Sequence, residues 1–329
     1  MNVFITGGAG FIGSHLADRL LERGDEVVVL DDFSSGSSDN IAHLQANPRF
    51  ECITGSADDP EAVAPLVRRT DAIVHLAAAV GVRLILDQPV HTIENNLFGT
   101  AVVLAEAAVA HRDGHPTKVI IASTSEVYGK GSRPPFRERD DITLGPTVNS
   151  RWAYACSKAM DEWLGLAYWR EYGLPVTIAR FFNTVGPRQT GRYGMVLPNF
   201  VDQALAGEPI TVFGDGRQSR CFCHVDDTVE AVMRLLDSTN TGGEVFNVGS
   251  TREITMYDLA QLVRQTVGSD SRIELIPYDK AYAEGFEDME RRVPDTTKLE
   301  NATGFRPRIT LEEIVTDVIA DRRARHAAA

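Results

Sequence analysis

Lysine, cysteine and long apolar runs are all scarce in this chain of 329 residues. Five of its 33 lysine and arginine residues are lysine, so a lysine inside a motif is seldom there by chance. The four cysteines form no C-x-x-C pair, which excludes the usual zinc-ligand spacing and predicts small buried thiols in a reducing compartment. No run approaches the roughly 18 apolar residues that cross a bilayer. We therefore expect a cytoplasmic protein with no metal site and no membrane partner.

Positive charge is also in deficit. The chain has 46 acidic residues against 33 lysine and arginine residues, a formal net charge of -13. A negative surface repels polyanions, which argues against nucleic acid as the main partner. A small anionic ligand held in a local basic pocket stays open.

Short and nearly continuous apolar segments alternate with helical stretches over the first 125 residues. This order predicts a Rossmann-type, doubly wound parallel sheet, because strands covered on both faces carry no polar side. We expect residues 1–182 to form this α/β domain, and residues 183–329 to form mainly a smaller, mixed α/β substrate-binding lobe from which a strand could return to the sheet. The expected strands are 2–6, 26–31, 50–54, 72–76, 118–123 and 176–181, and the expected helices are 11–23, 60–68, 89–111, 152–172, 199–206, 225–236 and 256–267.

A glycine-rich turn directly follows the first expected strand. Gly7, Gly10 and Gly13 allow a tight turn, a close approach of the backbone to a pyrophosphate, and close packing of helix on strand, with the phosphates at a helix N-terminus. Asp31 ends the next strand, where a carboxylate accepts hydrogen bonds from ribose hydroxyls and repels a 2′-phosphate. The sequence therefore predicts an NAD site rather than an NADP site.

Tyr154 and Lys158 are placed one helical turn apart, on one face of the helix. A nearby cation favours the phenolate, so we expect Lys158 to lower the pKa of Tyr154 and let it take a proton from a substrate hydroxyl. Upstream, an extended backbone would put Thr124 and Glu126 on one face, with Ser125 opposite. We expect Thr124 to hydrogen-bond the reacting hydroxyl and Glu126 to reach a neighbouring carbon.

All three tryptophans, Trp152, Trp163 and Trp169, lie on the expected helix 152–172. They form either a core-facing stripe or an apolar face that pairs with a second subunit. We expect a homodimer through the helices around 89–111 and 152–172.

The spacing of the first glycines, Gly7-x-x-Gly10-x-x-Gly13, resembles that of the extended short-chain dehydrogenases/reductases. The segments His75-Leu76-Ala77-Ala78 and Asn96-x-x-Gly99-Thr100 are similar to the cofactor-lining segment and the N-x-x-G-T helix of that superfamily. The resemblance implies that NAD is bound by Gly7, Gly10, Phe11, Ile12, Gly13, Asp31, Asp32, Ser34, Gly36, Asp58, Leu76, Ala77, Ala78, Asn96, Tyr154 and Lys158.

A narrower resemblance, to the UDP-glucuronate decarboxylases among the NAD-dependent sugar-nucleotide epimerases and dehydratases, covers essentially the whole chain. Its motifs are Ser123-Thr124-Ser125-Glu126-Val127-Tyr128-Gly129, Arg151-Trp152-x-Tyr154-x-x-Ser157-Lys158, Phe182-Asn183-x-x-Gly186-Pro187-Arg188 and Arg291-Arg292-Val293-Pro294-Asp295. By that similarity the catalytic residues are Thr124, Glu126, Tyr154, Lys158 and Arg292. The substrate contacts that it implies are Ser125, Asn183, Arg188, Tyr193, Val196, Phe213, Arg220 and Arg292.

The resemblance implies decarboxylation of UDP-glucuronate through a 4-keto intermediate, which gives UDP-xylose, UDP-4-keto-pentose or both. Val293, and the run Ala155-Cys156-Ser157 after Tyr154, depart from the commoner decarboxylases, so 4-epimerisation of UDP-glucuronate or UDP-glucose stays open. Sugar-nucleotide 4,6-dehydratases typically have an Asp-Glu pair where this chain has Ser125-Glu126, which counts against dehydration.

Overall fold

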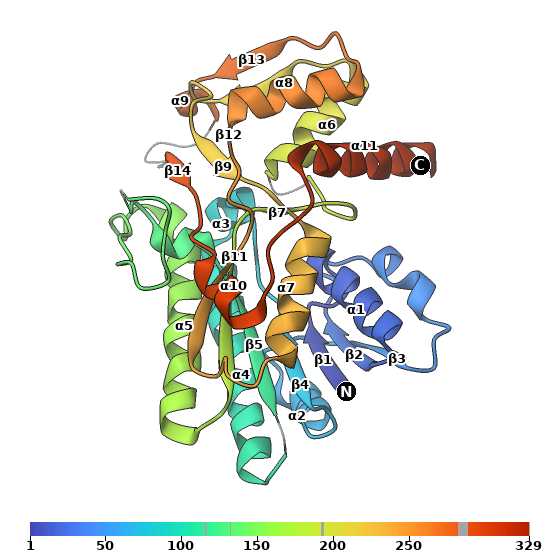
Figure 1. Ribbon diagram of the computed structural model, residues 1–329, viewed down its shortest axis with the longest axis vertical. Coiled ribbons are helices and arrows are strands. Elements are labelled where there is room, and N and C mark those ends of the chain that lie inside the picture. Colours follow the sequence, from blue (N-terminus) through green and yellow to red (C-terminus); the bar gives the residue numbers. More distant parts are fainter. Residues whose placement is uncertain (116, 132, 192–193, 282–288, 329) are drawn as a thin grey trace.

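The computed structural model describes residues 1–115, 117–131, 133–191, 194–281 and 289–328, and its largest element is a seven-stranded sheet (Figure 1). The strand order is β11-β6-β5-β4-β1-β2-β3, and every neighbouring pair is parallel. The predicted α/β class is confirmed, and the six predicted strands match within one residue. The strands are β1 (Asn2–Thr6), β2 (Glu26–Asp31), β3 (Phe50–Thr54), β4 (Ala72–His75), β5 (Lys118–Thr124), β6 (Val176–Phe181) and β11 (Glu244–Val248).

Helices cover both faces of this sheet (Figure 1). On one face, α1 (Phe11–Arg23) and α7 (Val225–Asp237) bury leucine and valine side chains in a shared core with β1 and β2. On the other face, α2 (Pro60–Val67), α4 (Pro89–Arg112) and α5 (Ala153–Tyr172) share a second core with β4, β5 and β6. Burial on both faces is why these strands are nearly continuous in apolar residues.

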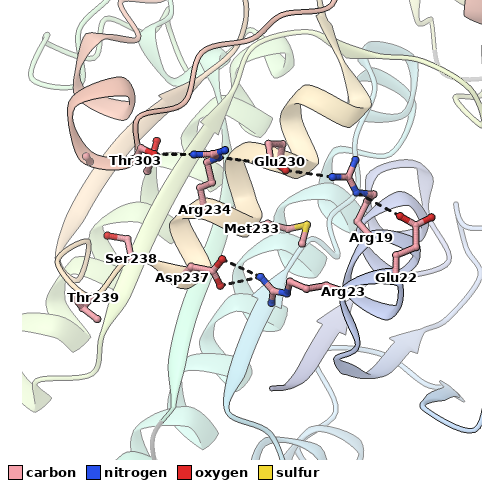
Figure 2. Close-up of a pocket in the computed structure, with 11 residues that line it drawn as sticks. Arg19, Glu22, Arg23, Glu230, Met233, Arg234, Asp237, Ser238, Thr239 and Thr303 are labelled. Atoms are coloured by element: carbon pink, nitrogen blue, oxygen red, sulfur yellow. Dashed lines mark hydrogen bonds and ion pairs between the residues drawn. The ribbon is translucent and has the colours of Figure 1, made fainter.

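A pocket between α1, α7 and the end of α10 (Thr297–Thr303) is bordered by charged side chains (Figure 2). Arg23 Nη1 pairs with Asp237 at 2.9 Å, and Arg19 Nη2 pairs with Glu230 at 3.4 Å. Glu230 also accepts a hydrogen bond from Arg234 Nε at 2.7 Å. Such exposed pairs contribute at most about 1 kcal/mol each, so the apolar core beneath them is what holds α7 to α1.

The smaller lobe has its own apolar core, which is built mainly from three helices. These are α6 (Val196–Ala206), α8 (Met256–Val267) and α11 (Leu311–Ala328). Its short strands form two pairs, β8 (Ile210–Phe213) with β13 (Ile273–Ile276) and β7 (Thr184–Val185) with β10 (Cys223–His224). A small three-stranded sheet has the order β12 (Glu253–Thr255), β9 (Ser219–Cys221), β14 (Arg291–Arg292). Two further short helices are α9 (Tyr278–Ala281) and α3 (Val82–Asp87), and α3 contacts α4 of the large domain.

The second half of the chain also contributes to the large sheet. After β10 the chain forms α7, which packs on the sheet, and then β11, which pairs with β6 at the edge of the sheet. Among the described residues, no helix is both long enough and apolar enough to cross a membrane.

The aromatic residues of α5 divide between the interior and the surface. Trp152, in the 3-10 turn that precedes α5, is 3% exposed, whereas Trp163 is 57% exposed. Met160 on the same helix and Phe98 on α4 are also exposed. The stripe predicted from the sequence is therefore partly core and partly an apolar surface shared by α4 and α5.

Candidate active site

The turn between β1 and α1 and the first turn of α1 each contain a position that tolerates only glycine. Gly7 has a φ of +70°, and a Cβ there would lie 2.8 Å from the backbone nitrogen of Ala77. A Cβ at Gly13 would lie 2.3 Å from the carbonyl oxygen of Gly7. No side chain caps the start of α1 at Gly10, so the helix N-terminus presents backbone amides in the way that phosphate sites do.

Asp31 fastens this turn to the end of β2. Its two carboxylate oxygens accept hydrogen bonds from Ala9 N at 2.8 Å and from Phe33 N at 2.9 Å. Burial raises the pKa of Asp31, and these backbone hydrogen bonds oppose that effect. Next to it, Asp32 accepts hydrogen bonds from the backbone and the hydroxyl of Ser34. Each carboxylate oxygen has further lone pairs that ribose hydroxyls can use.

The segment after β4 is held against α5 by one buried amide. Asn96 Oδ1 accepts a hydrogen bond from Ala79 N at 2.8 Å, and Asn96 Nδ2 donates to Ser157 Oγ at 3.1 Å. Ser157 Oγ in turn donates to the carbonyl of Tyr154 at 2.9 Å. This places the cofactor-lining segment predicted from the sequence next to the first turn of α5, whereas Asp58 lies exposed beyond β3.

Tyr154 is a buried phenol among hydrogen-bonding and charged groups. The hydroxyl of Thr124 hydrogen-bonds its oxygen, and Lys158 Nζ donates to Asp161 Oδ2 at 2.7 Å. The pKa of Tyr154 is raised, first by burial and then by the charge of Glu126, with Asp161 acting in the same direction. The predicted lowering of this pKa by Lys158 is not found, because the ammonium is paired with Asp161 and burial dominates.

The backbone turns directly after Thr124, so the condition of an extended backbone, under which Thr124 and Glu126 would share a face, is not met. β5 ends at Thr124, and Ser125–Tyr128 forms a 3-10 turn. Thr124 Oγ1 accepts the hydrogen bond of Glu126 N at 3.2 Å and so caps this turn. The capped turn, rather than strand alternation, sets the direction of the Glu126 side chain.

Glu126 is clamped between two arginines. Arg151 Nη1 pairs with one carboxylate oxygen of Glu126, and Arg292 Nη1 pairs with the other at 3.2 Å. Burial would raise the pKa of Glu126, but Arg151 and Arg292 together outweigh it and lower the pKa to about 2. Glu126 is therefore a carboxylate at neutral pH. We did not predict Arg151 as a site residue, although it stands three positions before Tyr154 in the motif.

Two backbone pairings place Arg292 in the site. Phe136 N donates to the carbonyl of Val293 at 2.8 Å, which fixes the residue after Arg292. In the small sheet, Arg292 lies opposite Arg220, and the charge of Arg220 also lowers the pKa of Glu126. The structure thus brings Thr124, Ser125, Glu126, Tyr154, Lys158, Arg220 and Arg292 together as one site.

Arg188 and Asn183, two of the predicted substrate contacts, make other interactions. Arg188 Nη2 pairs with Asp18 of α1 at 2.8 Å. Asn183 Nδ2 donates to the carbonyl of Cys221 at 2.9 Å, which joins the segment after β6 to β9 of the small lobe. Both residues stand at the junction of the two parts of the chain rather than in the Glu126 cluster.

The remaining predicted contacts belong to the small lobe. Val196 begins α6, and Phe213 ends β8 with 38% of its surface exposed. Tyr193 lies outside the described residues.

Comparisons with known proteins show what the whole chain is similar to. Residues 4–318 match the family model described as GDP-mannose 4,6 dehydratase. The chain is 42% identical to the UDP-N-acetyl-alpha-D-glucosaminuronate decarboxylase of Bacillus cytotoxicus, over 96% of this chain and 95% of the relative. It is 37% identical to UDP-glucuronic acid decarboxylase 1 of Arabidopsis thaliana, over 99% of this chain and 70% of the relative. A solved structure of UDP-glucuronic acid 4-epimerase from Bacillus cereus, in complex with UDP-glucuronic acid and NAD, matches with a TM-score of 0.86 and 27% identity over 98% of this chain and 99% of that one.

Proposed function

The chain belongs to the GDP-mannose 4,6-dehydratase family of extended short-chain dehydrogenases/reductases, and from this premise we propose that it is an NAD-dependent decarboxylase of UDP-glucuronate. The observation that carries the proposal is the carboxyl group of Glu126, held between Arg151 and Arg292 beside the Thr124–Tyr154 hydrogen bond. The two relatives named above, which act as decarboxylases of UDP-linked uronic acids, support it over nearly the whole chain.

The charges of the site favour decarboxylation over dehydration. A 4,6-dehydratase needs an acid to protonate the leaving hydroxyl, whereas Glu126 has a pKa of about 2 and is preceded by Ser125 rather than by a second acid. Arg292 and Arg220 supply positive charge where a sugar carboxylate would bind. A 4-epimerase that acts on UDP-glucuronate would use the same charges, so the product distinguishes these two reactions.

The glycine turn, the α1 N-terminus and Asp31 fit NAD, because a side chain at Gly7 or Gly13 would clash with the backbone that forms the cradle. Bound there, NAD would take the hydrogen at C4 of the sugar as hydride and could return it later. Tyr154 Oη takes the proton of the C4 hydroxyl, while the Thr124 hydroxyl donates a hydrogen bond to the reacting oxygen.

Oxidation places a ketone at C4, beta to the carboxylate on C5. When the C5–C6 bond breaks, its electron pair moves into the ketone and CO2 leaves. Tyr154 and Thr124 then stabilise the enolate oxygen by hydrogen bonds. Because Glu126 is ionised, the proton that C5 gains comes ultimately from solvent, and Glu126 acts by orienting Arg292 and the sugar.

The substituent at C2 of the sugar defines a second candidate substrate. The relative with 42% identity is named for the 2-acetamido sugar nucleotide, UDP-N-acetylglucosaminuronate. The same residues would decarboxylate either compound, since the chemistry involves C4, C5 and C6.

The test is product analysis by mass spectrometry. Purified protein is incubated with NAD and, separately, with UDP-glucuronate, UDP-N-acetylglucosaminuronate and UDP-glucose. We expect a uronate substrate to lose CO2 and form a UDP-pentose, a UDP-4-keto-pentose or both. Tyr154→Phe, which removes only the phenol oxygen, is the matched inactive control. A 4-epimer formed without loss of CO2, or loss of water, would overturn the proposal.

We also propose a homodimer formed through the outer face of α4 and α5. Phe98, Met160 and Trp163 are exposed there, and exposed apolar patches of this kind mark interfaces. The cytoplasmic location stays a prediction from the sequence.

A further inference from the structure

A buried ion pair lies on α5 one turn beyond Tyr154. Lys158 Nζ donates to Asp161 Oδ2 at 2.7 Å, with the two side chains 3% and 0% exposed. An i, i+3 pair of this kind on a helix surface would be screened by water, but this one is enclosed. The mechanism described above makes no use of Asp161.

The charged and titratable groups around Tyr154 come from several elements. Glu126 and Arg151 lie in the turns before α5, and Arg292 reaches Glu126 from β14. Lys158 and Asp161 come from α5 itself. His75 of β4 lies on the sheet side. Burial and the charge of Lys158 lower the pKa of His75 to about 3, so this side chain is neutral at neutral pH.

Asp161 is therefore the carboxylate that directly faces Lys158; burial raises the pKa of Asp161, and the ion pair with Lys158 opposes that effect. Glu126 pairs with Arg151 and Arg292, although its charge also raises the pKa of Tyr154, and His75 carries no charge. The next residue of the helix, Glu162, belongs to a different buried pair, with Arg180 Nη2 at 2.6 Å.

We propose that Asp161 is a positioning residue of this site, which fixes Lys158 Nζ and offsets the ammonium charge at the Tyr154 phenol, so that the phenol ionises at a higher pH than it would beside an unbalanced ammonium. This inference rests on the proposed role of Tyr154 in oxidation at C4. In this inference Lys158 acts as a fixed hydrogen-bond donor whose charge is balanced by Asp161. The sequence alone predicted a cation without such a partner.

The charge of Asp161 can be removed with little change of shape. In Asp161→Asn, the phenol, the ammonium and residue 161 together have a net charge of +1, against zero in the wild type. The phenol then loses its proton at lower pH, because that loss leaves the three groups neutral instead of negative. We expect the apparent pKa to fall by about one unit, a tenfold gain in the ionised fraction below that pKa.

Two measurements on the NAD-loaded enzyme test this. The first is the pH profile of kcat/KM, whose acidic limb should move to lower pH in Asp161→Asn. The second is NMR of tyrosine labelled with carbon-13 at the ζ position, with the Tyr154 signal assigned by its loss in Tyr154→Phe. That signal should show the phenolate forming at the same lower pH. Asp161→Ser, which also removes the charge but is smaller, provides a second variant if the asparagine protein folds poorly.

Glu162→Gln is the matched control. It removes the adjacent buried carboxylate on the same helix and breaks an ion pair, so it should lower stability and leave the acidic limb unchanged. An acidic limb that stays in place or moves to higher pH in both Asp161 variants overturns the inference, as does an equal shift in Glu162→Gln.

Failure of the proposed function is distinguishable from failure of this inference. The proposed function fails if the wild type releases no CO2, whereas the NMR titration does not depend on which product forms.

Discussion

Replacing Glu126 with glutamine removes the negative charge between Arg151 and Arg292 and keeps the size of the side chain. The pKa of Glu126 falls from 4.5 to about 2 in the folded chain. A shift of that size corresponds to roughly 3 kcal/mol of stability at neutral pH. Breaking a buried pair while its arginines remain has a cost of similar size, about 3–5 kcal/mol.

The sign of this contribution fixes its pH dependence. Because the folded pKa is depressed, the stabilisation is fully present above the unfolded value of 4.5 and is lost as the pH falls toward 2. In urea unfolding near pH 7, Glu126→Gln should therefore be about 3 kcal/mol less stable than the wild type. Near pH 3 the difference should shrink to less than about half of that value.

Glu253 provides the control for this experiment. Its pKa is also lowered to about 2, first by a hydrogen bond from Arg291, but its side chain is 28% exposed. Solvent screening limits such a pair to about 1 kcal/mol or less, so Glu253→Gln should lose much less stability than Glu126→Gln. Equal losses in the two variants, or a loss below about 1 kcal/mol for Glu126→Gln near pH 7, would refute this view of the clamp. In the same preparation, turnover by Glu126→Gln should fall by about 100-fold or more with NAD binding retained.

Two further predictions concern the cofactor turn and the outer face of α5. In Gly13→Ala, the new methyl group would lie 2.3 Å from the Gly7 oxygen. The affinity for NAD, measured by fluorescence titration, should therefore fall by about tenfold or more. An affinity equal to that of the wild type would refute the role of this turn. Trp163→Glu should convert a dimer to a monomer, as measured by light scattering. The control is Tyr257→Glu, which changes an exposed side chain of the small lobe and should leave the dimer intact. A dimeric Trp163→Glu protein would contradict the proposed interface.

Much of the fold could be predicted because its signals are local. The strand, glycine turn and helix around Gly7 and Gly13 are continuous in sequence, and the bounds of β1 and α1 match the prediction. Tyr154 and Lys158 are likewise one turn apart on α5, as predicted. The family predicted from these motifs is confirmed by the match over residues 4–318, while the division of the chain at residue 182 stays a prediction.

The charges around the site were less predictable because they depend on contacts between distant segments. Arg151 reaches Glu126 across 25 residues, through two 3-10 turns that alternation rules do not describe. Arg292 lies 166 residues from Glu126 and was placed by resemblance alone. Asp161 was overlooked although its i, i+3 spacing to Lys158 was visible, because the sequence does not show that both side chains are buried.

The position of β11 affects how the chain can fold as it is synthesised. β11 completes the edge of the large sheet beside β6, yet it ends at Val248, 67 residues after β6 ends. Until that strand and α7 emerge from the ribosome, the hydrogen-bonding edge of β6 stays open and the apolar side of α1 lacks its cover. The cofactor-binding half therefore cannot mature before the following segment, and a fragment cut at residue 182 would be prone to edge-to-edge aggregation.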